Sequence, residues 1–443
     1  MSATAARRDR VIARFVALYG RRPRFLVRAP GRVNLIGEHT DYNGLPVLPF
    51  AIERQLWVVA ADRADCGVRI ASSDERFAPR RYELQARLQR FGAGDWGNYH
   101  QAAAHGLIGT LGIGALRGGD FLVDSEVPAD AGLSSSAALV VGSMLALLAV
   151  AGRHIEPLPL AQLAAEAERY VGTQTGGMDQ AACLLGRAGH ALRIDFDPLR
   201  VRAVPIPSGV ALVVCHSLVD AQKSGAARVA YNQRVAECRL ACRVLERVLG
   251  TRLPRPLAHF GDLAQLFPER SLVDFADLLE QALPRRPLTL DEIAAQVGMA
   301  RARLAAAIGD VPASATFELA ARARHVCGEA ERVAAAEAAL AAADWKRLGA
   351  LMHASHASCR DDYAISAPAL EELVAAAHES GAYGARLTGA GFGGCTINLV
   401  RAADAALFLA RMERAFYAPR PAGRGREHAF VVSPSAGASV EML

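Results

Sequence analysis

The chain has 443 residues, of which 52% are hydrophobic and 21% charged, so it can fill the cores of two or three domains. This composition excludes a disordered chain, no apolar run is long enough to span a membrane, and eight scattered cysteines without a CxxC pair exclude a zinc ribbon. The 50 basic and 45 acidic residues are interspersed, so the net charge of +5 indicates no nucleic-acid partner.

The N-terminal part of the chain predicts one helix followed by short strands. The arginine-rich opening segment lacks the apolar core of a secretory signal and fits an amphipathic helix with Val11, Phe15 and Leu18 turned inward. We therefore expect a cytoplasmic protein with no membrane partner. Apolar runs between turns predict strands at Phe25–Arg28, Gln55–Ala61, Val68–Ala71 and Gly119–Val123.

Helices and further strands follow. Helices are expected at Trp96–Leu111, Ser135–Ala151, Leu160–Tyr170, Arg228–Gly250, Pro368–Ser380 and Ala405–Tyr417, and strands at His190–Phe196, Val210–Cys215 and Cys395–Val400. Residues 250–345 form an alanine-rich helical insert, in which Thr289 and Glu292 have the spacing of a helix-capping box. The pattern predicts two α+β domains, residues 1–208 and 209–443, with the boundary near the turn at 205–210.

The first segment with a chemical character is RAPGRVNLIGEHTDYNG, residues 28–44. Its polar side chains are Arg32, Asn34, Glu38, His39 and Asp41. Carboxylates, an imidazole and an amide close together beside glycines are suited to a polyhydroxylated ligand. The alternative, a charged loop closed by an Asn-Gly turn, accounts poorly for so many different donors and acceptors.

The second segment, PADAGLSSSAA at residues 128–138, leads into an apolar helix. Serines and small residues at a helix start offer free N–H groups, hydroxyls and the positive end of the helix dipole to an anion. A simple serine N-cap is the alternative, but three consecutive serines after Gly-Leu favour phosphate binding. The segment predicts a phosphate-binding loop.

Two further segments combine glycines with other small or acidic residues. RLTGAGFGGC, residues 386–395, indicates a loop pressed against another backbone or a ligand, with a tight strand connection as the alternative. Asp179 follows Gly176, Gly177 and Met178 and precedes an apolar stretch. From its position alone, it is either a helix cap or a functional carboxylate.

Together these segments resemble the galactokinases of the GHMP small-molecule kinase superfamily, over nearly the whole chain. GRVNLIGEHTDYNG is similar to the galactokinase signature, GLSSSAA and LTGAGFGGC to the second and third superfamily motifs, and HASCRDDY also matches the family. GTQTGGMDQ, AYNQRVAECRLA and the region around Leu288–Val297 are more similar to the N-acetylgalactosamine kinase branch. The resemblance implies a two-domain α+β fold with the active site in the interdomain cleft.

The resemblance implies ATP-dependent phosphorylation of the C1 hydroxyl of galactose by direct transfer, giving α-galactose 1-phosphate. Asp179 would take the proton from the hydroxyl, and Arg32 would lie between Asp179 and the phosphoryl group. The residues implied to hold the sugar are Glu38, His39, Asp41, Gly176 and Tyr231. Those implied to surround ATP are Gly132, Leu133, Ser134, Ser135, Ser136 and Ala137, with Trp96 and Tyr99 at the adenine end. Mg²⁺ would be bound by Ser136 and Glu168.

The chain departs from the family pattern at several positions. In the family, the magnesium-binding glutamate usually stands one position before Glu168. Asp130, which precedes the three serines, is expected to lie away from the phosphates. Gly177 replaces a common isoleucine and would leave room for an N-acetyl group. The alternatives are therefore an N-acetylgalactosamine kinase and a non-catalytic galactose-sensing regulator, although the intact Ala137-Ala138 pair and Asp179 favour an enzyme. We expect the protein to be a monomer.

Overall fold

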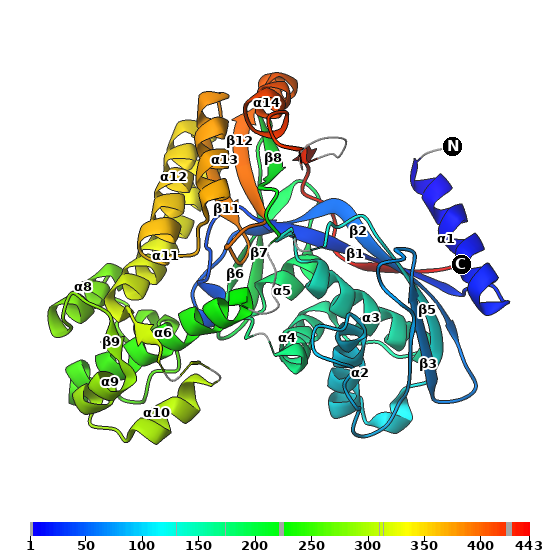
Figure 1. Cartoon of the computed structure of the whole chain (residues 1–443), viewed down its shortest axis with the longest axis horizontal. Coiled ribbons are helices and arrows are strands. Elements are labelled where there is room, and N and C mark those ends of the chain that lie inside the picture. The colour runs from blue at the N-terminus through cyan, green and yellow to red at the C-terminus, as the bar shows by residue number, and fades with distance from the viewer. Residues whose placement is uncertain are drawn as a thin grey trace.

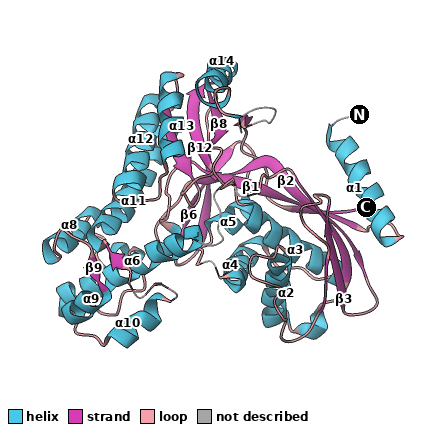
Figure 2. Ribbon diagram, in the orientation of Figure 1, coloured by secondary structure: helices cyan, strands magenta, loops and turns pink. Residues whose placement is uncertain are grey.

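The computed structural model describes residues 3–129, 131–172, 174–220, 226–309, 311–312, 314–421 and 428–443 (Figure 1). The helices are α1 Ala3–Tyr19, α2 Gly97–Leu111, α3 Ser135–Ala151, α4 Pro157–Glu168, α5 Met178–Leu185, α6 Ala226–Leu249, α7 Gly261–Leu266, α8 Leu272–Ala282, α9 Leu290–Val297, α10 Arg301–Ile308, α11 Leu319–Ala341, α12 Trp345–Asp361, α13 Pro368–Glu379 and α14 Ala405–Met412. The strands are β1 Phe25–Asn34, β2 Pro49–Asp62, β3 Gly67–Ser72, β4 Arg80–Glu83, β5 Gly119–Ser125, β6 His190–Asp195, β7 Arg200–Pro205, β8 Val210–His216, β9 Leu288–Thr289, β10 Thr316–Phe317, β11 Gly384–Thr388, β12 Cys395–Arg401, β13 Ala429–Val432 and β14 Ser439–Met442. Figure 2 shows helices packed around the strands, which confirms the predicted α+β class.

The larger sheet has the strand order β14-β1-β2-β5-β3-β4 among the described residues, and only the β3–β5 pair is parallel. Helix α3 is apolar on all sides and packs against β1 and β2, as expected of a helix buried in a core. A side chain at Gly142 would contact Val58, Leu56 and Ala29, so glycine lets the helix approach the sheet closely. Helices α2–α5 lie on one side of this sheet and α1 on the other (Figure 1).

Strand β1 is longer than predicted, because it continues through a proline and a glycine to Asn34. Its pairing with β2 shifts register between Pro30 and Arg32, and such an irregularity accommodates residues that normally end a strand. Arg32 therefore projects from a buried, hydrogen-bonded strand and not from a loop. The prediction for Leu18 was also wrong. Leu18 is 46% exposed, whereas Tyr19 packs against the core of α1 and donates to the carbonyl of Phe121.

A second, four-stranded sheet has the order β11-β12-β8-β13. Alternate residues of β8 face opposite sides: Leu212 and Val214 join a core shared with β1 and β2, whereas Val213 and Cys215 pack with α13 and α14. The predicted turn at 205–210 separates β7 from β8. However, β14 pairs with β1, so the chain's last strand belongs to the N-terminal sheet and the division at 208 does not hold there.

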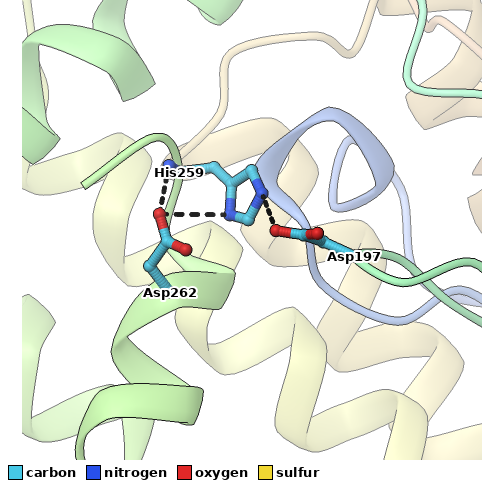
Figure 3. Close-up of side chains that lie close together, drawn as sticks. All are labelled: Asp197, His259 and Asp262. Carbon is cyan, nitrogen blue, oxygen red and sulfur yellow. Dashed lines mark hydrogen bonds and ion pairs between the residues drawn. The ribbon is translucent and has the colours of Figure 1, made fainter. Parts of the chain in front are cut away.

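The helices between residues 226 and 341 share a core to which Leu45, Tyr363 and Leu387 also contribute. Helix α6 precedes residue 250, so the insert at 250–345 stays a prediction. The capping box is confirmed, since the Thr289 side chain accepts from Glu292 N–H and the Glu292 side chain accepts from Thr289 N–H. A polar cluster joins this region to the β6–β7 turn, with His259 between Asp197 and Asp262 (Figure 3). Asp262 accepts hydrogen bonds from Arg255 and from two backbone N–H groups. These bonds account for the cluster as one that holds the two segments together.

The ion pair between α6 and α11 tests how much these helices depend on a buried charge. Arg322 Nε lies 2.7 Å from Glu237 Oε2, and the two side chains are 2% and 1% exposed. Glu237→Gln should lower the free energy of unfolding by about 3 kcal/mol, because it leaves the buried guanidinium without a charged partner at that position. Chemical or thermal unfolding would measure this change.

The matched control is Asp404→Asn, which removes one partner of the exposed Arg401–Asp404 pair. Exposed ion pairs contribute little, so this variant should unfold at nearly the wild-type midpoint. Similar shifts in the two variants would show that the burial of Glu237 has no particular energetic consequence.

Candidate active site

A cavity of about 820 Å³ lies where the predicted motifs meet. The residues named from the sequence that line it are Arg32, Glu38, His39, Asp41, Trp96, Gly132, Ser134, Ser135, Ser136, Asp179 and Tyr231. Within the described part of the chain, the remaining predicted residues lie outside its lining: Leu133, Ala137, Glu168 and Gly176. Segments that are far apart in the sequence, from Arg32 to Gly389, thus converge on one open cavity, as a ligand site requires.

Arg32 and Asp179 form an ion pair at the wall of this cavity. Nε and Nη2 of Arg32 both lie 2.7 Å from Asp179 Oδ1, and the side chains are only 4% and 13% exposed. Asp179 is the second residue of α5, whose N-cap is Gly177, so the helix-cap interpretation of Asp179 was wrong. Arg32 also donates from Nη1 to the carbonyl of Gly132 at 2.6 Å, which connects the carboxylate to the serine loop.

Asp41 lies beside this pair at the start of a 3-10 turn, Asp41–Asn43. Burial and the nearby charge of Asp179 raise the pKa of Asp41 to about 6, so it is largely ionised only above that pH. Its Oδ2 accepts from Met178 N–H at 3.4 Å. A side chain at Gly176 would lie 2.3 Å from Tyr42 N, so Gly176 has the close backbone contact that only glycine allows.

Gly177 does not open the cavity toward a larger sugar. A side chain there would point at Ala165 and Phe196, which do not line the cavity, and the φ of +110° disfavours any residue with a Cβ. The expectation that Gly177 leaves room for an N-acetyl group was therefore wrong. The sequence showed a missing side chain but not its direction, which the left-handed backbone turns away from the site.

His39 is held as a neutral imidazole in a ring of aromatic groups. Burial and His325 lower its pKa to about 3. Nε2 lies 3.2 Å from the carbonyl of Ala390 and must carry the proton, so Nδ1 accepts from the Tyr42 hydroxyl at 2.7 Å. The ring of Tyr231, from α6, lies 5.2 Å from the His39 ring and also borders the cavity.

Glu38 connects the first motif to the third. Its Oε1 accepts from Gly389 N–H at 2.9 Å and from Arg386 Nη1 at 3.2 Å. Burial raises the pKa of Glu38, although Arg386 opposes the shift. A side chain at Gly389 would lie 2.6 Å from the carbonyl of Gly132, so the third motif is pressed against the second, as its glycines predicted.

The serine loop reaches the cavity at the start of α3. Ser134 occupies the N-cap position with a left-handed backbone (φ 62°), yet its side chain does not cap the helix. Its hydroxyl is buried and has no hydrogen-bond partner among the described residues. The first N–H groups of α3 have no carbonyl one turn earlier to bind, so this helix start is suited to an anion. Asp130, for which a position away from phosphate was expected, lies outside the described residues.

Three predicted nucleotide or metal residues lie behind this surface. Leu133 is buried and accepts from the backbone N–H of Arg32 at 3.1 Å, and Ala137 is buried in the core. Glu168 ends α4, is buried, and accepts a hydrogen bond from Gln180 Nε2. Its proposed contact with a metal therefore stays a prediction that the geometry does not favour.

Sequence reasoning missed most of the apolar end of the cavity. Trp96 and Tyr99 were named from the sequence, whereas the aromatic rings of Phe77, Phe91 and Tyr170, which line the same cavity, were not. Trp96 Nε1 donates to the carbonyl of Ala78 at 2.8 Å, and its ring centroid lies 6.0 Å from that of Phe77. These residues are scattered over a long loop and two helical segments without a shared motif, so only the fold reveals that they are neighbours.

Comparisons with known proteins agree with this arrangement. Family models match as the galactokinase galactose-binding signature at residues 13–62, the GHMP kinase N-terminal domain at 98–187 and the GHMP kinase C-terminal domain at 336–418. A galactokinase of a Roseiflexus species is 39% identical over 410 residues, covering 91% of this chain and 90% of its own length. The galactokinase of Dictyostelium discoideum is 35% identical and covers 90% and 85%.

A solved structure of Lactococcus lactis galactokinase in complex with galactose matches with a TM-score of 0.77 and 27% identity, covering 97% of this chain and 99% of that one. The mevalonate kinase of L. major, with a TM-score of 0.55 and 17% identity, shares the fold. These comparisons give no support to the N-acetylgalactosamine branch or to a non-catalytic sensor. At 35–39% identity over nearly its full length, the chain belongs to the galactokinase family of the GHMP kinases.

Proposed function

We propose that this chain phosphorylates the C1 hydroxyl of galactose with ATP, by direct transfer and without a covalent enzyme intermediate. The observation that carries the proposal is the Arg32–Asp179 ion pair. This pair borders a cavity that is lined both by the galactokinase signature, residues 31–44, and by the serine loop. The curated relatives named above are galactokinases, and one solved relative was crystallised with galactose. An assay of ADP release from ATP, with galactose and other hexoses as acceptors, tests this directly.

In the proposed mechanism, Asp179 accepts the proton of the C1 hydroxyl as the oxygen attacks the terminal phosphorus. The adjacent guanidinium of Arg32 favours the anionic form of this carboxylate and stabilises charge on the phosphoryl oxygens. Asp41 accepts hydrogen bonds from other sugar hydroxyls, and Tyr231 borders the same end of the cavity. Phosphoryl transfer depends mainly on position and charge, so one base and one cation suffice as side-chain chemistry.

The serine loop would hold the phosphates of ATP, and the aromatic end of the cavity would hold adenine. The buried hydroxyl of Ser134 and the open N–H groups of the first turn of α3 fit this use. Mg²⁺, which neutralises phosphate charge, would be bound by phosphate oxygens and the Ser136 hydroxyl. Glu168 as a second metal ligand, a monomeric state and a cytoplasmic location stay predictions.

Removal of the proposed base should abolish most turnover while leaving both substrates bound. Asp179→Asn keeps the shape of the side chain but cannot take a proton, so kcat should fall by about 10²–10⁴-fold. The matched control is Asp195→Asn, the same change in a partly buried ion pair with Arg193, outside the cavity, which should keep wild-type kcat. A folded Asp179→Asn enzyme with more than about a third of wild-type turnover would refute the assignment.

Sugar binding should weaken in acid because of Asp41. Its pKa of about 6 means that the acceptor carboxylate becomes protonated as the pH falls below that value. Calorimetry should therefore show galactose affinity falling between pH 7 and 5 for wild type, and weak, nearly pH-independent binding for Asp41→Asn. Parallel pH profiles in the two proteins would exclude Asp41 as the titrating group.

The same carboxylate should destabilise the protein without ligand. Because its pKa is raised on folding from 3.8, the ionised form is disfavoured in the folded state at pH 7. Asp41→Asn should be more stable than wild type at pH 7, by up to about 3 kcal/mol, and this difference should shrink as the pH falls through 6 toward 4.

Ser134→Ala should separate stability from nucleotide binding. The variant removes a buried hydroxyl that has no partner within the described chain, so the ligand-free protein should be as stable as wild type or more so. The KM for magnesium-ATP should rise severalfold while the KM for galactose stays the same. A loss of stability without ATP, measured by thermal unfolding, would show that the hydroxyl has a structural partner.

A further inference from the structure

Helix α11 contacts the loop of the galactokinase signature, within residues 31–44, through groups that do not line the cavity. Glu329, in the middle of α11, is completely buried, and its Oε1 accepts from Gly37 N–H at 2.9 Å and from Glu38 N–H at 3.3 Å. The same oxygen accepts from the Ser355 hydroxyl at 2.6 Å, and Oε2 accepts from Arg332 Nε at 2.7 Å. Each of these four contacts pairs the carboxylate with a donor, and two of the donors are consecutive peptide N–H groups of the loop.

His325 lies one turn earlier on the same face of α11. Its Nε2 is 3.0 Å from the carbonyl of Glu38, which can only accept, so Nε2 carries the proton. Burial lowers the pKa of His325 to about 4, which leaves a neutral ring at pH 7. Burial alone would raise the pKa of Glu329, but Arg332 and His325 lower it to about 2. At neutral pH one side chain is therefore a fixed acceptor and the other a fixed donor.

The loop needs this support because its backbone is strained. Gly37 has φ of 100° and His39 has φ of 60°, a left-handed conformation that costs about 1–3 kcal/mol for a residue with a side chain. A side chain at Gly37 would lie 2.9 Å from Val333 Cγ2, so α11 also packs directly under the turn. Hydrogen bonds from α11 hold the peptide groups immediately before His39 in this conformation.

We propose that Glu329 and His325 are positioning residues for sugar recognition. Neither lines the cavity, but together they fix the backbone from which His39 and Asp41 reach it. This inference rests on the proposed galactokinase function. When the support is lost, the loop relaxes to less strained conformations, and sugar binding must restore the strained one at a cost in affinity. ATP, which binds at the serine loop, is not affected in this way.

The test compares a disruptive and a conservative variant at each position. Glu329→Met keeps the volume but removes the acceptor, and His325→Leu removes the donor; Glu329→Gln and His325→Gln retain one polar group in place. The control is Glu237→Gln, which weakens another buried ion pair of α11, that of Arg322, without touching the loop. The wild type and all variants are compared by calorimetric galactose binding and by steady-state kinetics below their unfolding temperatures.

Glu329→Met and His325→Leu should each raise the KM and Kd for galactose by about 5- to 100-fold, the effect of leaving one or two buried groups unpaired. The KM for magnesium-ATP should stay within about twofold and kcat at saturating galactose within about threefold. The two glutamine variants should recover most of the affinity. Glu237→Gln should lower the unfolding midpoint but keep the wild-type KM for galactose.

Unchanged galactose affinity in the two disruptive variants would overturn the inference, as would an equal rise in both KM values with a fall in kcat. If Glu329→Met does not fold, His325→Leu and His325→Gln test the inference, because these variants change a single hydrogen bond to the loop. A wild-type protein that neither binds nor phosphorylates galactose would overturn the proposed function first, and this inference with it.

Discussion

The ion pair between Glu38 and Arg386 holds together the segments that form the site. Both side chains are at most 2% exposed, and Arg386 also donates to the carbonyl of Asn34 and to the Ser355 hydroxyl. One guanidinium thereby contacts β1, α12 and the signature loop, while Glu38 binds the N–H of Gly389 in the third motif. Desolvation makes such a pair costly to bury, so its value lies in fixed geometry more than in net stability.

Side chains of opposite charge lie next to one another behind the cavity. Arg332, Glu329, Arg386 and Glu38 form a row in which each charge faces an opposite one or a backbone dipole. These paired charges leave the two nearby histidines neutral, because burial and the neighbouring cations disfavour a further positive charge. Both histidines are therefore uncharged at neutral pH, whereas the pKa of Asp41, about 6, lies close to neutrality.

Much of the fold could be predicted from periodicity and from residues that end helices. The apolar run Ser135–Ala151 was correct at both ends, because serines precede it and Gly152 adopts a left-handed conformation after it. Local patterns failed where a tertiary contact overrides them. Proline and glycine normally end a strand, but pairing with β2 carries β1 through both to Asn34. Periodicity placed Leu18 inside, whereas the position of the sheet favours Tyr19.

The candidate site was predictable where its residues are close in sequence. Arg32, Glu38, His39 and Asp41 lie in one motif, and all of them line the cavity. The sequence could not show that Glu329 binds the same loop, because it lies 292 positions from Gly37 on a helix that carries no obvious motif. The sequence also could not show which way a side chain at a given position would point. At Gly177 the left-handed backbone decides this.

The pairing of β14 with β1 makes one edge of the larger sheet depend on residues 439–442. Phe25 is opposite Met442, and Arg28 is bridged to Glu441 across 413 positions, so this edge of the sheet closes only after almost all the intervening chain has been made. During synthesis, β1 has an exposed edge that can pair with other chains, a known route to aggregation. The strand that carries Arg32 thus gains its partner β14 late, and a polypeptide cut short before residue 439 would leave this edge of the sheet open.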